Sequence, residues 1–150
     1  MKNIINIINE EISKFNKTNF YDIDDDVIIN HFYMRNFSEE VNKNHLKGFI
    51  GKSGKKYVIN KLINHDVFKV YLESDINNPI GLATFDENND YFSGYEHAQS
   101  IQVDDNYRRD GIASALIDFA EIIYNKPYKP SNLLSPEMQG LIKNRFNLEN

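Results

Sequence analysis

The sequence lacks cysteine and long apolar runs, and each absence excludes a class of protein. Without cysteine the chain can form no disulfide framework, no thiolate metal site and no cysteine nucleophile. No run approaches the roughly 18 consecutive apolar residues that a membrane helix needs, so we expect no membrane partner. Near the start of the chain, Asn6 and Asn9 interrupt the apolar residues, which argues against a secretory signal and makes a cytoplasmic location the expectation.

Positive charge is also scarce. The 150 residues include 17 lysines and arginines against 22 aspartates and glutamates, a formal net charge of −5. This balance argues against a nucleic-acid partner bound through a basic face, and it favours a cationic partner such as an amine. A hydrophobic fraction of 41% and an aromatic fraction of 13% indicate a globular protein, and the length predicts a single domain over residues 1–150.

Hydrophobic periodicity indicates where the helices lie. Apolar residues at helical spacing predict helices over residues 2–16 and 111–124, and a capping residue followed by proline predicts a last helix over 136–146. Between Asp24 and Phe37 the pattern fits either a helix that begins at the aspartates or a segment that leads into a strand.

The middle of the chain has short runs of alternating apolar and polar residues, which indicate strands joined by tight turns. Four strands are predicted, over residues 57–63, 67–72, 80–85 and 98–103. We expect the chain to turn or break at residues 52–55, 64–66, 77–79 and 87–90, and to form a loop over 91–95. Successive strands with short turns form an antiparallel meander.

Three common functional motifs are incomplete or absent. Gly51-Lys52-Ser53 is similar to the end of a phosphate-binding P-loop. However, Leu46 stands where that motif needs glycine and a strand follows, so a hairpin turn is the better interpretation. The four histidines show no metal-ligand spacing and no Gly-x-Ser-x-Gly elbow occurs, so we expect no metal site and no hydrolase triad.

The segment 101–116 has the strongest functional signal, because it joins a strand to the clearest helix through a loop with two arginines. The first turn of a helix has unpaired N–H groups and the positive end of the helix dipole, so it can bind an anion. Gly111 and Ala113 are small enough for a phosphate to approach the backbone, and Arg108 and Arg109 add positive charge. The alternative is an ordinary strand–loop–helix connection with two exposed arginines.

The pattern Arg108-x-x-Gly111-x-Ala113 resembles motif A of the GNAT acetyltransferase superfamily, whose signature is Arg/Gln-x-x-Gly-x-Gly/Ala, and the likeness extends over residues 57–124. The resemblance implies an α/β (α+β) fold: a mixed, mostly antiparallel sheet with helices on both faces. It also implies an enzyme, an N-acetyltransferase that uses acetyl-CoA as cosubstrate. An amine of a small molecule or a protein would attack the thioester carbonyl directly, in a ternary complex.

The resemblance also implies roles for particular residues. The main chain of the strand would pair with the pantetheine arm, and the loop and first turn of the helix would hold the pyrophosphate. The cofactor-binding residues are then Ile101, Gln102, Val103, Arg108, Arg109, Asp110, Gly111, Ile112, Ala113 and Ser114. Because Asp110 adds a negative charge to this loop, we expect its side chain to point to solvent or the affinity to be lower. For catalysis, Glu96 and His97 are candidate bases and Tyr124 is a candidate acid, although each also fits a structural role.

The region after Tyr124 departs from the family pattern, because a short stretch with two prolines stands where a long strand and a closing hairpin are usual. Alternatives from other classes therefore stay open. One is a non-catalytic CoA-binding or protein-interaction module that keeps the fold. Another is an acetyltransferase toxin that acts on charged tRNA, which the acidic balance disfavours. The acceptor and the oligomeric state, a homodimer included, stay open as well.

Overall fold

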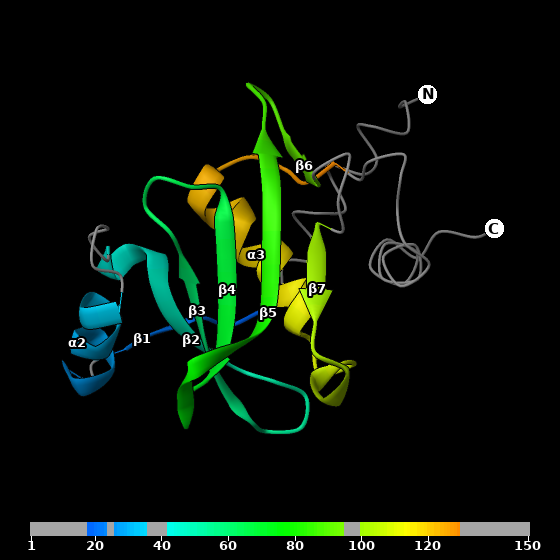
Figure 1. Cartoon of the computed structure of the whole chain (residues 1–150). Coiled ribbons are helices and arrows are strands. Elements are labelled where there is room, and N and C mark those ends of the chain that lie inside the picture. The colour runs from blue at the N-terminus through cyan, green and yellow to red at the C-terminus, as the bar shows by residue number, and fades with distance from the viewer. Residues whose placement is uncertain (1–17, 24–25, 36–41, 95–99, 130–150) are drawn as a thin grey trace.

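In the described part of the chain, seven strands form one sheet whose neighbouring strands are antiparallel (Figure 1). The structure, a computed structural model, describes residues 18–23, 26–35, 42–94 and 100–129. The strands are β1 (Tyr21–Asp22), β2 (Leu46–Ile50), β3 (Lys56–Lys61), β4 (Val67–Leu72), β5 (Asp75–Glu87), β6 (Phe92–Gly94) and β7 (Ile101–Val103). They lie in the order β1-β2-β3-β4-β5-β6, and β7 pairs with β5 as well.

The meander from β3 to β5 follows the predicted strands, with one difference. β4 has the predicted bounds and β3 covers most of its predicted segment. The predicted break at residues 77–79 is wrong, because β5 continues through it. Pro79 lies opposite Tyr71 at a register shift, where the ladder is irregular and a residue without an N–H group is tolerated.

Three strands, β1, β2 and β6, were not expected from the sequence. The two-residue strand β1 pairs with β2. β2 pairs with β3 over its whole length. β6 replaces most of the predicted loop over residues 91–95, because Phe92 is fully buried and pairs with Glu87 of β5. The predicted helices over residues 2–16 and 136–146 lie outside the described residues.

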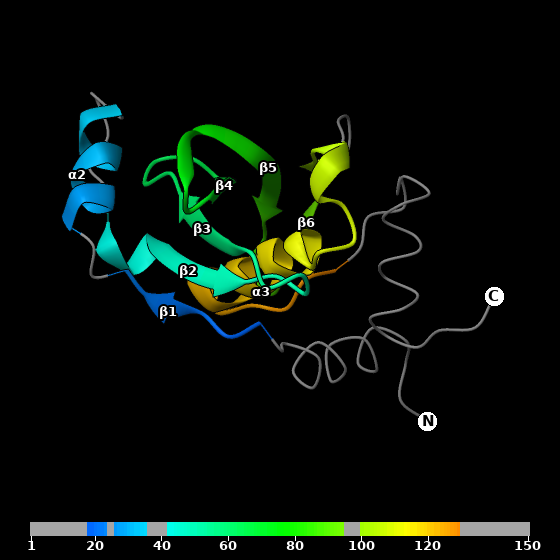
Figure 2. The same cartoon turned by 90° about the horizontal axis from the view of Figure 1, so that it is seen from below.

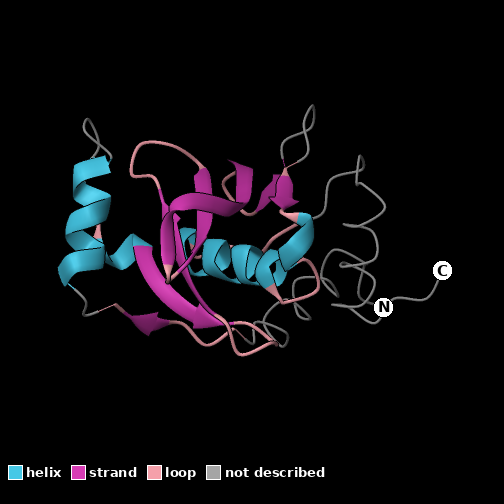
Figure 3. Cartoon of the chain, turned by 60° about the horizontal axis from the view of Figure 1, so that its bottom comes forward, coloured by secondary structure: helices cyan, strands magenta, loops and turns pink. Residues whose placement is uncertain are grey.

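Helices lie on both faces of the sheet, as the family resemblance implies. α2 (Asp26–Arg35) shows that the ambiguous segment is a helix, with Asp26 in its first turn, where a negative charge complements the helix dipole. α3 (Ile112–Tyr124) agrees with the predicted helix to within one residue. The sheet curves around α3, and α2 lies outside the curve (Figures 2 and 3). Two short 3-10 helices, η1 (Lys43–His45) and η2 (Asp105–Tyr107), complete the described elements.

Strand alternation divides the core between these helices. Tyr57 and Ile59 pack in a large cluster with α3, whereas Val58 packs in a smaller cluster with α2, because successive side chains of β3 point to opposite faces. The large cluster is rich in aromatic rings. At its centre the ring of Phe68 contacts the rings of Phe85, Phe119 and Tyr124, with centroids 5.5, 6.0 and 5.8 Å away.

Two acidic residues of α3, Asp118 and Glu121, are buried as well as its apolar residues, and each accepts hydrogen bonds from a neighbouring segment. Asp118, only 1% exposed, accepts hydrogen bonds from the main-chain N–H and the hydroxyl of Thr18. The carboxylate of Glu121 accepts from the N–H of Tyr128 at 3.4 Å. Among the described helices, none combines the length and apolarity needed to cross a membrane.

Gly81 allows α3 to approach the sheet closely at its first residue. A Cβ at position 81 would lie 3.0 Å from Ile112 Cγ2 and 3.3 Å from Val70 Cβ. We therefore expect Gly81→Val to destabilise the fold by roughly 1–3 kcal/mol through overpacking, measured by urea denaturation. In a double-mutant cycle with Ile112→Ala, the combined loss should be smaller than the sum of the single losses. Additive losses would contradict a direct contact between the two side chains.

Candidate functional site

β7 has an edge that no described strand occupies. Ser100 O and Asp104 N are each 2.8 Å from their main-chain partners on β5, and Gln102 lies between them in the same ladder. Since successive residues of a strand direct their N–H and C=O groups to opposite edges, the main-chain groups of Ile101 and Val103 face away from β5. Of the three strand residues predicted to bind cofactor, Gln102 therefore directs its main chain into the sheet.

The described part of the chain after α3, which ends at Lys129, pairs with β6 but not with β7. Phe92 forms a parallel bridge with Tyr128, in which Phe92 N is 3.1 Å from Pro127 O and Lys129 N is 2.8 Å from Phe92 O. No other described segment continues this pairing along β7. Among the described residues, the outer edge of β7 therefore has no strand partner, and an edge of this kind is where an extended ligand can pair as an additional strand.

The loop after β7 leads into the first turn of α3. The first intrahelical bond runs from Ala115 N to Gly111 O at 2.9 Å, so the N–H groups of Ile112, Ala113 and Ser114 precede it. Gly111 has φ of 90° and a Cβ built there meets no atom within 4 Å, so the space beside it is open. The unpaired N–H groups and the helix dipole make this turn suited to a phosphate.

The two arginines of the loop are placed differently. Arg108 Nε donates to Val103 O at 3.3 Å and its guanidinium pairs with Asp105 at 2.9 Å, so this side chain connects the loop to the end of β7. Arg109 is exposed and adopts a left-handed backbone conformation with φ of 64°, which is uncommon for a residue other than glycine.

The side chain of Asp110 does not point to solvent, so the first of the two alternatives expected for it is wrong. It is 8% exposed and points toward the turn between β2 and β3. One carboxylate oxygen accepts from Ser53 N at 2.6 Å, and the other accepts from Ser53 Oγ at 2.8 Å and Tyr57 Oη at 2.5 Å. Lys52 N donates to the main-chain oxygen of Asp110 at 3.2 Å. The turn and the loop are therefore joined by both main chain and side chain.

These hydrogen bonds determine the charge state of the pair. Burial alone would raise the pKa of Asp110, but the donors from Tyr57 and Ser53 outweigh it and hold the pKa below its usual range. Burial and the adjacent carboxylate raise the pKa of the Tyr57 phenol, which stays protonated and remains a donor. Asp110 is therefore a carboxylate at neutral pH.

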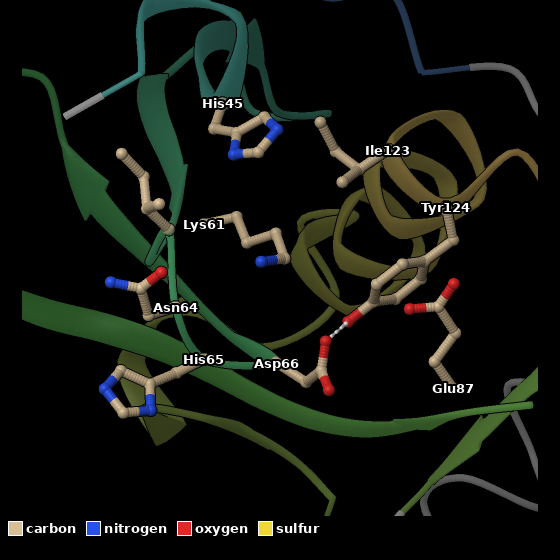
Figure 4. Close-up of a pocket in the computed structure, with 9 residues that line it drawn as sticks. His45, Lys61, Asn64, His65, Asp66, Glu87, Ile123 and Tyr124 are labelled. Carbon is tan, nitrogen blue, oxygen red and sulfur yellow. Dashed lines mark hydrogen bonds between the residues drawn. The ribbon is translucent and has the colours of Figure 1, made fainter. Parts of the chain in front are cut away.

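Of the three predicted catalytic residues, the structure describes Tyr124 alone. Glu96 and His97 lie outside the described residues. Tyr124 is at the opposite end of α3, which spans about 20 Å for its 13 residues. Its hydroxyl donates to Asp66 Oδ1 at 2.6 Å, and burial together with this carboxylate raises the pKa of the phenol (Figure 4). The structure does not bring Tyr124 together with the predicted cofactor-binding residues.

Tyr124 lines a cavity of about 420 Å³ at this end of α3. In Figure 4, Tyr124 points toward Asp66 across the cavity. His45 also lines this cavity, and burial together with the nearby positive charge of Lys61 lowers its pKa. The lining residues are His45, Lys61, Ile63, Asn64, His65, Asp66, Glu87, Ile123 and Tyr124. This polar cavity is separate from the loop between β7 and α3.

Comparison with protein families gives one match. A model described as the acetyltransferase (GNAT) family matches residues 35–127, well over half of the chain. The chain belongs to the GNAT family. Comparisons with curated proteins and with solved structures find no match. The matched segment of this GNAT protein contains β7, the loop and all of α3, so membership and geometry point to the same part of the fold.

Membership of the family supports acetyltransferase activity in general. GNAT proteins generally use acetyl-CoA, and membership supports its use here at the same general level. The observed sheet and helices agree with the GNAT α/β fold. The described residues contain no group of three or more histidines and carboxylates that could hold a metal ion.

Sequence reasoning did not identify Ser53 and Tyr57 as neighbours of the loop. Ser53 lies 57 positions before Asp110, and the turn that contains it was interpreted only as a hairpin. One signal could have pointed to them. Asp110 is an acidic residue in a loop expected to bind an anion, so its carboxylate needs hydrogen-bond donors elsewhere in the fold that hold it away from the ligand.

Proposed function

We propose that the protein is an N-acetyltransferase that transfers the acetyl group of acetyl-CoA to an amine. The observation that carries this proposal is that no described strand pairs with the outer edge of β7, and that the loop after β7 leads to the N–H groups that precede the first intrahelical bond of α3. Pantetheine would pair with the main chain of Ile101 and Val103. The pyrophosphate would bind the loop from Arg108 to Gly111 and the amides of Ile112, Ala113 and Ser114.

The transfer would be direct. An acceptor ammonium first loses a proton to a base, and its nitrogen then attacks the thioester carbonyl carbon. The carbon–sulfur bond then breaks, the attacking nitrogen loses a second proton to become the amide, and the leaving CoA thiolate takes up one proton to become the thiol. Glu96 and His97 are proposed as bases, whereas Tyr124 can act as an acid only by giving up its hydrogen bond to Asp66. The net charge of −5 favours a cationic acceptor.

The proposal is tested by thermal unfolding with acetyl-CoA. Ligand at about 100 times its Kd should stabilise the folded chain by about 2.7 kcal/mol and raise Tm by roughly 5–10 °C. Free pantetheine, which lacks the pyrophosphate, should raise Tm much less. No shift with millimolar acetyl-CoA or CoA would overturn the cofactor assignment.

Catalysis needs a separate measurement. Incubation with acetyl-CoA and a panel of polyamines, peptides and aminoglycosides should release free CoA thiol with at least one amine. Binding without release on any of these amines would favour the non-catalytic CoA-binding alternative.

A further inference from the structure

Asp110 presents an electrostatic problem for an anion site. It lies between Arg109 and Gly111, in the loop that would bind the pyrophosphate, and it is ionised at neutral pH. A free carboxylate at this position would repel a phosphate, because like charges a few ångströms apart are strongly unfavourable at a partly buried site. The structure resolves the conflict by directing the carboxylate toward the β2–β3 turn.

We propose that Asp110 is a positioning residue: Ser53 and Tyr57 hold its charge away from the bound pyrophosphate and thereby fix the phosphate loop. The inference rests on the proposed function. Three donors satisfy the carboxylate, and one of them, the phenol of Tyr57, is fully buried. These three hydrogen bonds to Asp110, which we call the Asp110 anchor, therefore begin at the edge of the core, whereas the Arg108–Asp105 pair is an exposed contact.

Two backbone features fit this role. Arg109 and Gly111 have φ of 64° and 90°, so the chain is left-handed on each side of Asp110. Gly51 leaves room for the carboxylate, since a Cβ at position 51 would lie 2.4 Å from Asp110 Oδ2 and 2.7 Å from the ring of Tyr57. The turn thus accommodates the carboxylate in a recess that a larger residue at position 51 would fill.

If the Asp110 anchor keeps negative charge away from the pyrophosphate, CoA affinity that is lost with the donors should return when the charge is removed. A contact with only a structural role does not predict this recovery. Ser53→Ala with Tyr57→Phe removes two donors and leaves only Ser53 N. The carboxylate then turns toward water and the phosphate loop, because an under-bonded buried charge is unfavourable. Adding Asp110→Asn to this double variant removes the charge, so CoA affinity should recover even though the donors are still missing.

The experiment measures the Kd of CoA by calorimetry for the wild type, the double variant and the triple variant. We expect the double variant to bind about 3- to 10-fold more weakly at low salt through charge repulsion. The deficit should shrink between about 20 mM and about 500 mM salt, because the repulsion is screened. The triple variant should return to within about twofold of the wild type. Tyr21→Phe, which removes a phenol–carboxylate bond to Glu73 (3.1 Å) outside the loop, is the matched control and should leave Kd unchanged.

An unchanged Kd in the double variant, or a triple variant as weak as the double, would overturn the inference and leave the proposed function standing. Absence of CoA binding by the wild type would overturn both. If the double variant fails to fold, Ser53→Ala alone serves, because Ser53 is an exposed turn residue and Tyr57 stays intact. The same salt dependence and the same recovery with Asp110→Asn are then expected at smaller amplitude.

Discussion

Replacing Ala113 by glutamate is expected to weaken CoA binding at least about tenfold, equal to about 1.4 kcal/mol, while making the fold slightly more stable. Ala113 is the second residue of α3 and is partly exposed, so a longer side chain has room beside it. A glutamate there repels the pyrophosphate. The same negative charge in the first turn stabilises the helix by roughly 0.3–1 kcal/mol. Binding and stability should therefore change in opposite directions.

Ala113→Gln is the matched control, because glutamine has the size of glutamate without its charge. Calorimetry with CoA should show a smaller loss for glutamine than for glutamate, and urea denaturation should show the glutamate variant to be at least as stable as the wild type. Unchanged affinity in the glutamate variant would mean that the pyrophosphate does not bind at the start of α3.

Much of the central fold could be predicted from local sequence patterns. The bounds of β4 and the extent of α3 follow from strict alternation and from helical spacing, which are local signals. β5 was interrupted in the prediction because Asn77 to Pro79 has strong turn chemistry. Pairing with β4 overrides that signal. The register shift at Tyr71 places Pro79 where the ladder is irregular, so the missing N–H group of the proline is tolerated.

The candidate site could be predicted only in part. The strand, the loop and the small residues of the first helical turn are contiguous, so motif spacing identifies them. The recess for Asp110 is built from a turn more than 50 positions earlier, as the separation of 57 between Ser53 and Asp110 shows. No local pattern carries that contact. A sequence alone places the acidic residue in the loop, but the direction of its side chain depends on how β2 and β3 pack beside α3.

The main-chain groups that β7 directs to its outer edge likewise follow from register. The alternation that directs Gln102 to β5 and leaves Ile101 and Val103 outward depends on which residue of β7 lies opposite Leu82. A shift of one residue would reverse the assignment, and nothing in the three-residue strand itself distinguishes the two registers.

Phe68→Ala should have the largest effect on stability, a loss of about 3–5 kcal/mol. Phe68 is fully buried, and its ring contacts β5 through Phe85 and α3 through Phe119 and Tyr124. Truncation leaves a cavity where the sheet meets the helix and removes three aromatic contacts. Because domains of this size are stable by about 5–15 kcal/mol, the variant should be marginally folded. Urea denaturation followed by circular dichroism measures the change, and an unchanged slope keeps the comparison valid.

The matched control for this loss is Ile122→Ala, which lies on α3, the helix that Phe68 contacts, but is 54% exposed. It should change the free energy of unfolding by less than about 0.5 kcal/mol. A loss below about 1 kcal/mol for Phe68→Ala would contradict the packing described for the large cluster. Phe68 contacts the C-terminal half of α3, whereas the phosphate loop lies at its N-terminus. The folded fraction of the variant should therefore bind CoA with wild-type affinity, and added CoA should restore part of the lost stability by mass action. Weaker intrinsic binding would instead mean that the position of the whole helix, and not its first turn alone, determines the affinity of the site.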